Sequence, residues 1–308
     1  MTGDLKERPL EDELSVEFGY YPLDCNISGD GFSVQTLPCL QESIAAVSSD
    51  SRVCGKWRYA GTVHGKPYSE RIFGLPTTHI MTMYGEGSRE KLDFLVWCMS
   101  FFVGMRLTKT EAGFLDATPI KPGVLVDFRL SGNAMGGALD MCSAYFESHR
   151  TDPGACQRVK AVIHALFMAQ YPQNLEFESF QYLYMALDAC FRSLSDAESC
   201  KSYVPHGSRI QWMCGLLEIP VPEWAEHSDK APASVAAVRN DSFHEALFFG
   251  APLGFSLYGG SQQPLNRPNV ILQMQALVCR LLVAILGRPE AGYVRSPVHT
   301  RQIFHLDI

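Results

Sequence analysis

The hydrophobic pattern of the chain changes its period near residue 135. Before that point, apolar and polar residues alternate over short stretches, whereas beyond it apolar residues recur every three or four positions over long stretches. Alternation is typical of half-buried strands, and the longer period is typical of amphipathic helices. The sequence therefore predicts an α+β protein with an N-terminal β-rich domain at 1–135 and a C-terminal all-α domain at 136–308.

The first 135 residues are predicted to be mainly strands and turns, with one packed helix. A helix is expected to begin at Ser88, a residue type that caps helix N-termini, and to be buried because the run from Leu92 to Leu107 is apolar nearly all round. No other helix is predicted before residue 85. Strands are predicted at 14–20, 32–37, 56–60, 79–84 and 123–130.

From residue 135 onward the strand patterns vanish and helical spacing takes over. Proline- and glycine-containing segments separate the helices and supply the breaks between them. The predicted helices span 136–149, 153–171, 176–195, 208–217, 233–249 and 267–287.

Composition restricts the class of protein. A hydrophobic content of 46% supports a sizeable core, and a net charge of −7 argues against a general nucleic-acid coat, so any RNA contact has to be local. The ten cysteines form no CxxC pair, which predicts neither a zinc site nor a disulfide framework and suggests a reducing cytoplasm.

The N-terminus is polar and acidic, and the longest apolar run, 94–105, is too short to span a bilayer. We expect a soluble cytoplasmic protein without a membrane anchor.

The segment 238–247 places Arg239, Asn240 and His244 within six residues of a predicted helix. At about 100° per residue, Asn240 and His244 lie one turn apart on one face, while Arg239 is roughly 140° from His244 and can reach the same side through its length. A guanidinium, an amide and an imidazole together suit an anionic phosphate and a proton transfer. The alternative is that Arg239 and His244 are ordinary surface or core-edge residues.

Three segments in order carry a resemblance to a known family. They are ALDACF at 186–191, VRNDSFHEA at 238–246, and RLLVAILG at 280–287 followed by Tyr293. This order resembles HEPN domains (higher eukaryotes and prokaryotes nucleotide-binding), in particular the ApeA-like subgroup, over roughly residues 135–295. Their signature is an Arg, often followed by Asn, and a His after four to six residues, which Arg239, Asn240 and His244 match.

The resemblance implies an HEPN helical bundle that cleaves RNA as a homodimer, with no cofactor and no metal. The ribose 2′-OH would attack the adjacent phosphorus and leave a 2′,3′-cyclic phosphate. His244 would move protons, Arg239 would stabilise charge on the phosphorane oxygens, and Asn240 would orient His244 or the phosphate. The implied setting is prokaryotic defence or a toxin-like response, in which the N-terminal domain would recognise a trigger or an inhibitor.

Acidic residues near the motif leave alternatives open. HEPN domains often carry a polar or acidic residue on an earlier helix that faces the motif, and Asp188 is the candidate, although a paired structural acid is an equal alternative. Asp241 and Glu245 flank the motif and could point outward, regulate the site or mark a degenerate one.

Two rival functions remain. A catalytically silent HEPN module for dimerisation or binding predicts that Arg239 and His244 are splayed apart or paired with Asp241 or Glu245. A transferase-like or nucleotide-binding role predicts a deep pocket in residues 1–135.

Other candidate residues are expected to be structural. A metal site at His64 and His79 with Cys54 is conceivable but lacks ligand spacing, and the same holds for three further histidines, His149, His164 and His206. Residues 132–137 are expected to form an interdomain turn, and Trp224 to be a core residue, with an RNA groove as the alternative.

Overall fold

The structure is a computed structural model that describes residues 13–59, 62–63, 66–67, 75–85, 88–109, 117–131, 134–198, 203–228, 234–244, 269–298 and 302–308. At 62–63, 66–67, 234 and 241–244 the description covers the backbone alone. The predictions for His64 and Glu245 and the side-chain prediction for Asp241 lie outside the described residues.

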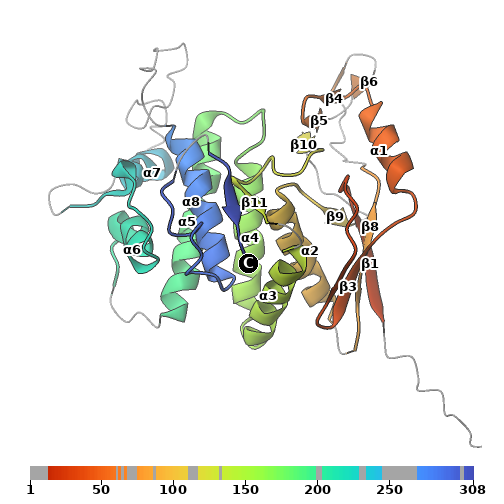
Figure 1. Cartoon of the computed structure of the whole chain (residues 1–308). Coiled ribbons are helices and arrows are strands. Elements are labelled where there is room, and N and C mark those ends of the chain that lie inside the picture. The colour runs from red at the N-terminus through yellow and green to blue at the C-terminus, as the bar shows by residue number, and fades with distance from the viewer. Residues whose placement is uncertain are drawn as a thin grey trace, which may run out of the picture.

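An antiparallel five-stranded sheet forms the N-terminal part of the fold (Figure 1). Its order is β2 (Ile27–Gly29), β3 (Phe32–Thr36), β8 (His79–Met83), β1 (Leu14–Gly19) and β9 (Thr108–Lys109). The strands predicted at 14–20, 32–37 and 79–84 are confirmed. Phe18, Val34 and Met81 of these strands are fully buried in the core.

Smaller pairings complete the β structure. The strand predicted at 56–60 is confirmed as β5 (Trp57–Tyr59), which lies between β10 (Ala117–Pro119) and β4 (Val53–Cys54). A separate hairpin joins β6 (Thr62–Val63) to β7 (Lys66–Pro67).

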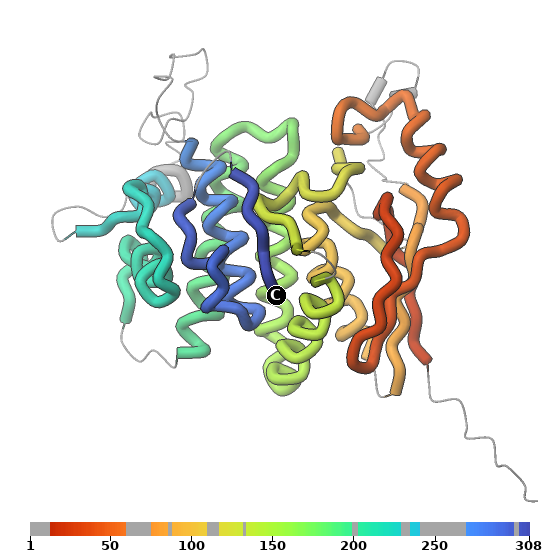
Figure 2. The backbone as a smooth tube through the Cα atoms, viewed as in Figure 1, coloured from red at the N-terminus to blue at the C-terminus, as the bar shows by residue number. Residues whose placement is uncertain are grey.

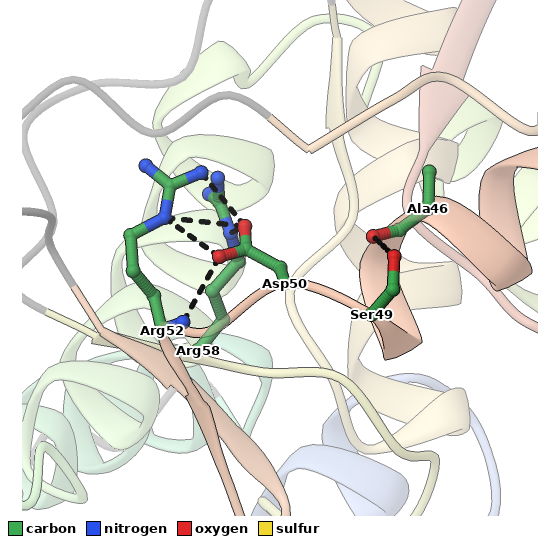
Figure 3. Close-up of polar contacts among 5 residues, drawn as sticks. All are labelled: Ala46, Ser49, Asp50, Arg52 and Arg58. Atoms are coloured by element: carbon green, nitrogen blue, oxygen red, sulfur yellow. Dashed lines mark hydrogen bonds and ion pairs between the residues drawn. The ribbon is translucent and has the colours of Figure 1, made fainter.

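The turn before β4 is fixed by one carboxylate and two guanidinium groups (Figure 3). Asp50 Oδ2 accepts from Arg52 Nη2 at 2.7 Å and from Arg58 Nε at 2.8 Å, and Asp50 Oδ1 accepts from the Arg52 backbone at 2.9 Å. The Arg52 hydrogen bonds, followed by Arg58, hold the pKa of the Asp50 carboxyl well below its usual range. These charge-assisted bonds tie β4 and β5 to the end of the preceding helix.

That preceding helix, α1 (Leu40–Ser48), contradicts the prediction that residues 1–85 contain only strands and turns. Leu40, Ser43 and Val47 are its buried residues, and their spacing places them on one helical face. The stretch is short and follows Pro38, so the apolar positions were too few to reveal the period.

Helix α2 (Arg89–Val103) links the sheet to the helical part, since it packs against β1, β8, α3 and α4. The predicted cap is confirmed, because Ser88 Oγ accepts from the Lys91 backbone at 3.1 Å. The predicted end at Leu107 is wrong: Gly104 adopts φ +62 and ends the helix. A Cβ at Gly104 would lie 2.6 Å from Val126, so the close approach as well as the backbone conformation requires glycine.

The strand predicted at 123–130 is shorter than expected, as β11 (Phe128–Leu130). Gly123 adopts φ +72, and the N–H groups of Val124 and Leu125 donate to the Gly104 carbonyl. This segment therefore binds the end of α2 instead of a neighbouring strand.

The predicted helices after residue 135 are present, with ends that differ by a few residues. They are α3 (Met135–Ser148), α4 (Pro153–Met168), α5 (Glu176–Ala197), α6 (Arg209–Leu216), α7 (Ser234–His244) and α8 (Val270–Ile285). Helices α4, α5 and α8 pack against one another, and α6 and α7 lie on the side away from the sheet (Figure 1). Short 3-10 turns, η1 (His206–Ser208) and η2 (Glu223–Ala225), flank α6. Parts of the predicted helices at 245–249 and 267–268 lie outside the described residues.

The C-terminal segment returns to pair with β11. Strand β12 (Phe304–Leu306) runs parallel to β11, and the dark-blue end of the chain in Figure 2 lies against the middle of the molecule. The expectation that strands vanish after residue 135 is therefore wrong for this segment, which is too short for its alternation to stand out.

Arg280 of α8 anchors this return. Its side chain is fully buried, and all five of its N–H groups find acceptors. Nη1 donates to Asp127 Oδ2 and to Ala276 O, both at 2.8 Å, Nε to Ser296 O at 3.0 Å, and Nη2 to Ser296 Oγ at 3.0 Å and Pro297 O at 2.9 Å. The Tyr293 hydroxyl also donates to Asp127. One guanidinium thus joins α8, the segment before β11 and the C-terminal segment.

The buried side chains form one continuous cluster, which includes Phe18 of the sheet, Phe94 of α2 and Leu277 of α8. Across the described ranges, no helix is both long and apolar enough to cross a membrane.

Candidate functional site

Helix α7 carries the motif predicted from the sequence. Helix α7 packs against η1 and η2. Its Val235 and Val238 are buried, Arg239 is half-buried and Asn240 is exposed. Arg239 Nη1 donates to Asn240 Oδ1 at 3.2 Å. His244 is the last residue of α7, one turn after Asn240, and its side chain lies outside the described residues.

Asp188, the acidic candidate on the earlier helix α5, contacts two basic side chains. Its Oδ1 accepts from Arg209 Nη1 at 3.2 Å, and its Oδ2 lies 3.3 Å from His206 Nε2. The Asp188 side chain is 34% exposed, so the pair is accessible from solvent. Both partners come from the segment around η1, which packs against α7.

Tyr184, one turn before Asp188, completes this cluster. Its hydroxyl lies 2.9 Å from His206 Nδ1, and the two rings stack with centroids 5.6 Å apart. Burial, followed by the Asp188 charge, raises the pKa of the Tyr184 hydroxyl, while Arg239 and Arg209 act to lower it. Arg239 lies on α7, which packs against η1, the turn that carries His206.

Arg209 is positioned by its surroundings. Its guanidinium lies over the Phe191 ring at 4.7 Å, and its Nε is shielded from solvent and has no hydrogen-bond partner. Stacking of this kind restricts the guanidinium while leaving its edge for in-plane acceptors.

Together, Tyr184, Asp188, His206, Arg209 and Arg239 form what we call the α5–α7 cluster. It combines two guanidinium groups and an imidazole with a single carboxylate. Such a set can bind an oxyanion through its guanidinium N–H groups and can move a proton through the imidazole.

The sequence pointed to part of this cluster. Asp188, Arg239 and Asn240 were predicted. Asp188 lies beside His206 of η1, α7 packs against η1, and Arg239 donates to Asn240. His206 was expected to be structural because it lacks metal-ligand spacing, and its contacts with Tyr184 and Asp188 were not predicted. The available signal was the i, i+3 spacing of His206 and Arg209 at the start of a helix, but nothing in the sequence linked it to Asp188.

His79 is structural, as predicted. It is fully buried in β8, with Nε2 at 3.2 Å from Thr36 Oγ1 and Nδ1 at 3.0 Å from Thr78 Oγ1. Its ring stacks on Phe18 with centroids 5.7 Å apart. Burial lowers the pKa of His79 to about 4, so the ring is neutral at pH 7.

Trp224 is also a core residue, as predicted, and its indole N–H donates to Gln273 Oε1 at 2.7 Å. Within the described ranges, no group of three His, Cys, Asp or Glu side chains is placed to hold a metal ion.

A cavity of about 270 Å³ lies where residues 124–127 meet Gln170, α8 and residues 302–303. Its lining residues come from both parts of the chain, before and after residue 135 in sequence. The nucleotide-binding alternative instead predicts a pocket formed within residues 1–135. Asp127, already bonded to Arg280 and Tyr293, contributes a polar wall to the observed cavity.

The chain matches no protein-family model, and searches of curated proteins and of solved structures find no similar protein.

Proposed function

We propose that the chain is a metal-independent endoribonuclease of HEPN type, with Arg239, Asn240, His244 and Asp188 in its site. One observation carries the proposal: α7 packs against η1, whose His206 bonds the Tyr184 hydroxyl and lies beside Asp188. The resemblance implies that an acid on an earlier helix faces the helix with the Arg-Asn-His motif, and in this proposal that acid is Asp188.

In this proposal Arg239 binds the scissile phosphate and stabilises the charge that builds on its oxygens. His244 moves protons between the ribose 2′-OH and the leaving 5′-oxygen, and Asn240 holds the phosphate or His244 by hydrogen bonds. Asp188 holds Arg209 and His206 in place at the edge of the site. The products are a 2′,3′-cyclic phosphate and a 5′-OH.

The wider setting is part of the same proposal. The protein would act in the cytoplasm as a homodimer whose two α7 helices face each other across one site. The β-rich segment 1–135, whose core is continuous with that of the helices, would recognise a trigger or an inhibitor in prokaryotic defence or a toxin-like response.

The test is cleavage of a mixed-sequence RNA in EDTA by wild type, His244→Ala, Arg239→Ala and the control Arg192→Ala. Arg192 is an exposed residue of α5 that pairs with Asp196 at 3.1 Å, so its removal changes the same charge away from the motif. Wild type and Arg192→Ala should cleave, and the two motif variants should be slower by about 10²–10⁴-fold. Equal cleavage by all four proteins would refute the assignment.

A catalytically silent HEPN module for dimerisation or partner binding is the second candidate. It is favoured by the bonds that already occupy the site, since Arg239 donates to Asn240, and Asp188 pairs with Arg209 and His206. It predicts dimers in sedimentation experiments, RNA left intact by wild type, and no effect of His244→Ala on dimerisation.

A further inference from the structure

One face of α8 forms a wall of the cavity of about 270 Å³. Leu272, Gln275, Ala276 and Cys279 line the cavity, and their spacing of three and four residues places them on one side of the helix. Ala276 and Cys279 are buried and small. This side of α8 therefore leaves space in front of residues 124–127.

The other walls are held in place by hydrogen bonds within the protein. The Leu125 N–H donates to Gly104 O at 2.9 Å, and Gln170 Nε2 donates to Leu125 O at 3.0 Å. The backbone N–H of Phe304, which follows the lining residues 302–303, donates to Asp127 O at 2.9 Å. The cavity is thus formed without a ligand, as is usual for small-molecule sites.

The charges around the cavity are balanced. Asp127 Oδ2 accepts from Arg280 Nη1 at 2.8 Å, and the Tyr293 hydroxyl donates to Asp127 Oδ1. None of the described residues that line the cavity is Lys, Arg or His. An anionic ligand would therefore meet no opposite charge, and a cationic ligand would meet a carboxylate that Arg280 already neutralises. The cavity suits an uncharged ligand.

Two fixed acceptors line the cavity. Gln170 Nε2 donates to Leu125 O and to Leu166 O, each at 3.0 Å, which orients the amide and leaves its Oε1 to accept a bond. The Asp127 carboxylate accepts one described bond at each oxygen and has room for more. A ligand that matches these acceptors carries N–H groups.

Two further side-chain amides line the cavity, those of Gln275 and Gln302. Neither forms a side-chain hydrogen bond to a residue that the structure describes. A glutamine amide offers a donor and an acceptor in one plane, and it pairs with the amino group and the adjacent ring nitrogen of adenine through two parallel bonds.

The remaining walls suit a small ring. Leu272 and Ile303 are large apolar residues that are 39% and 57% exposed, so the mouth of the cavity offers apolar contact to a flat ligand. The volume of about 270 Å³ lies just below the roughly 300–1,000 Å³ of sites for drug-sized molecules, which indicates a ligand of only one or two rings.

We propose that this cavity binds an uncharged heterocycle with an amino group beside a ring nitrogen, the chemistry of adenine. The N–H groups of the base donate to Gln170 Oε1 and to the Asp127 carboxylate, and the amide of Gln275 or Gln302 pairs with the amino edge. The cavity shares no residue with the α5–α7 cluster, so the proposal is independent of the proposed ribonuclease function.

The test is isothermal titration of the full chain with adenine, purine, adenosine and adenosine monophosphate. Adenine should bind saturably at or below millimolar concentration. Purine is the same ring system without the amino group, and it should bind about tenfold or more weakly, because acceptors in the cavity then stay unpaired. Adenosine that binds as tightly as adenine identifies a nucleoside as the ligand, and adenosine that fails to bind identifies the free base.

Variants of the cavity wall test its location. Ala276→Leu fills the space in front of α8 and should abolish adenine binding. Gln275→Leu combined with Gln302→Leu removes both amides and should weaken binding by about tenfold or more. The matched control combines Gln41→Leu with Gln157→Leu, two exposed glutamines of α1 and α4 away from the cavity, and should bind as wild type does. Circular dichroism and the Tm establish that each variant is folded.

Any of four results would overturn the proposal. They are no saturable binding of adenine by wild type, equal affinity for purine and adenine, wild-type affinity in folded Ala276→Leu or in the double glutamine variant, and adenosine monophosphate binding more tightly than both adenine and adenosine. The last result would require a cation in the site, which the cavity wall does not provide. Since the titration contains no RNA, its failure is distinct from a failure of the cleavage test.

Discussion

Buried His79 makes the stability of the fold depend on pH. The ring is neutral in the folded state, where burial lowers its pKa to about 4, and in the unfolded chain it titrates near 6.5. Because the folded pKa is the lower of the two, the unfolded chain binds a proton that the folded protein excludes between these values. The free energy of unfolding is therefore at its full value above pH 6.5 and decreases as the pH falls from 6.5 towards 4.

The size of the effect follows from the two pKa values. Between pH 7 and pH 5 the unfolded chain gains most of one proton at this residue, and the folded protein gains almost none. Linkage then lowers the free energy of unfolding by about 2 kcal/mol. Over the whole range to pH 4 the loss approaches about 3 kcal/mol.

The assay is urea unfolding of wild type and His79→Gln at pH 7 and pH 5. Carboxyl groups titrate in both proteins, so the difference between their pH dependences isolates His79. From pH 7 to pH 5, the free energy of unfolding should fall by about 2 kcal/mol more in wild type than in the variant. This difference does not depend on how stable the variant is at pH 7. An equal loss in both proteins would refute a neutral buried ring, and an imidazole NMR titration of wild type near 6.5 would do the same.

Three further changes have defined outcomes. Arg280→Met leaves Asp127 without its buried partner and should lower the free energy of unfolding by about 3–5 kcal/mol, with a smaller loss when Asp127→Asn is added. Gly104→Ala forces a Cβ onto a backbone at φ +62 and towards the 123–126 segment, so it should lose more than about 1 kcal/mol in urea unfolding. Asp188→Asn should change stability by less than about 1 kcal/mol, because its pairs are partly exposed, yet it should slow RNA cleavage by releasing Arg209.

Strands and helices with a long, regular pattern were predictable from the sequence. Residues 14–19 and 79–83 alternate over a full strand, and α5 repeats its apolar positions over 22 residues. Helix α1 and strand β12 were missed because each offers too few periods. The end of α2 was misplaced because apolar residues continue past Gly104, whose left-handed backbone is set by its contact with residues 123–126.

The candidate site was predictable only where it is local in sequence. Arg239 and Asn240 are neighbours on one helix, so their spacing revealed them. His206 and Arg209 reach Asp188 from about twenty residues away, and only packing of the η1 segment against α5 and α7 brings them together.

The most direct test of the central claim compares an RNA oligonucleotide with the same oligonucleotide carrying 2′-deoxyribose at the cleaved position, both in EDTA. The account predicts that wild type cleaves only the RNA and leaves 2′,3′-cyclic phosphate ends, because the 2′-OH is the nucleophile. His244→Ala should cleave neither at a comparable rate. Cleavage of the deoxy substrate, or equal cleavage of RNA by His244→Ala, would contradict a 2′-OH mechanism run by the α7 motif.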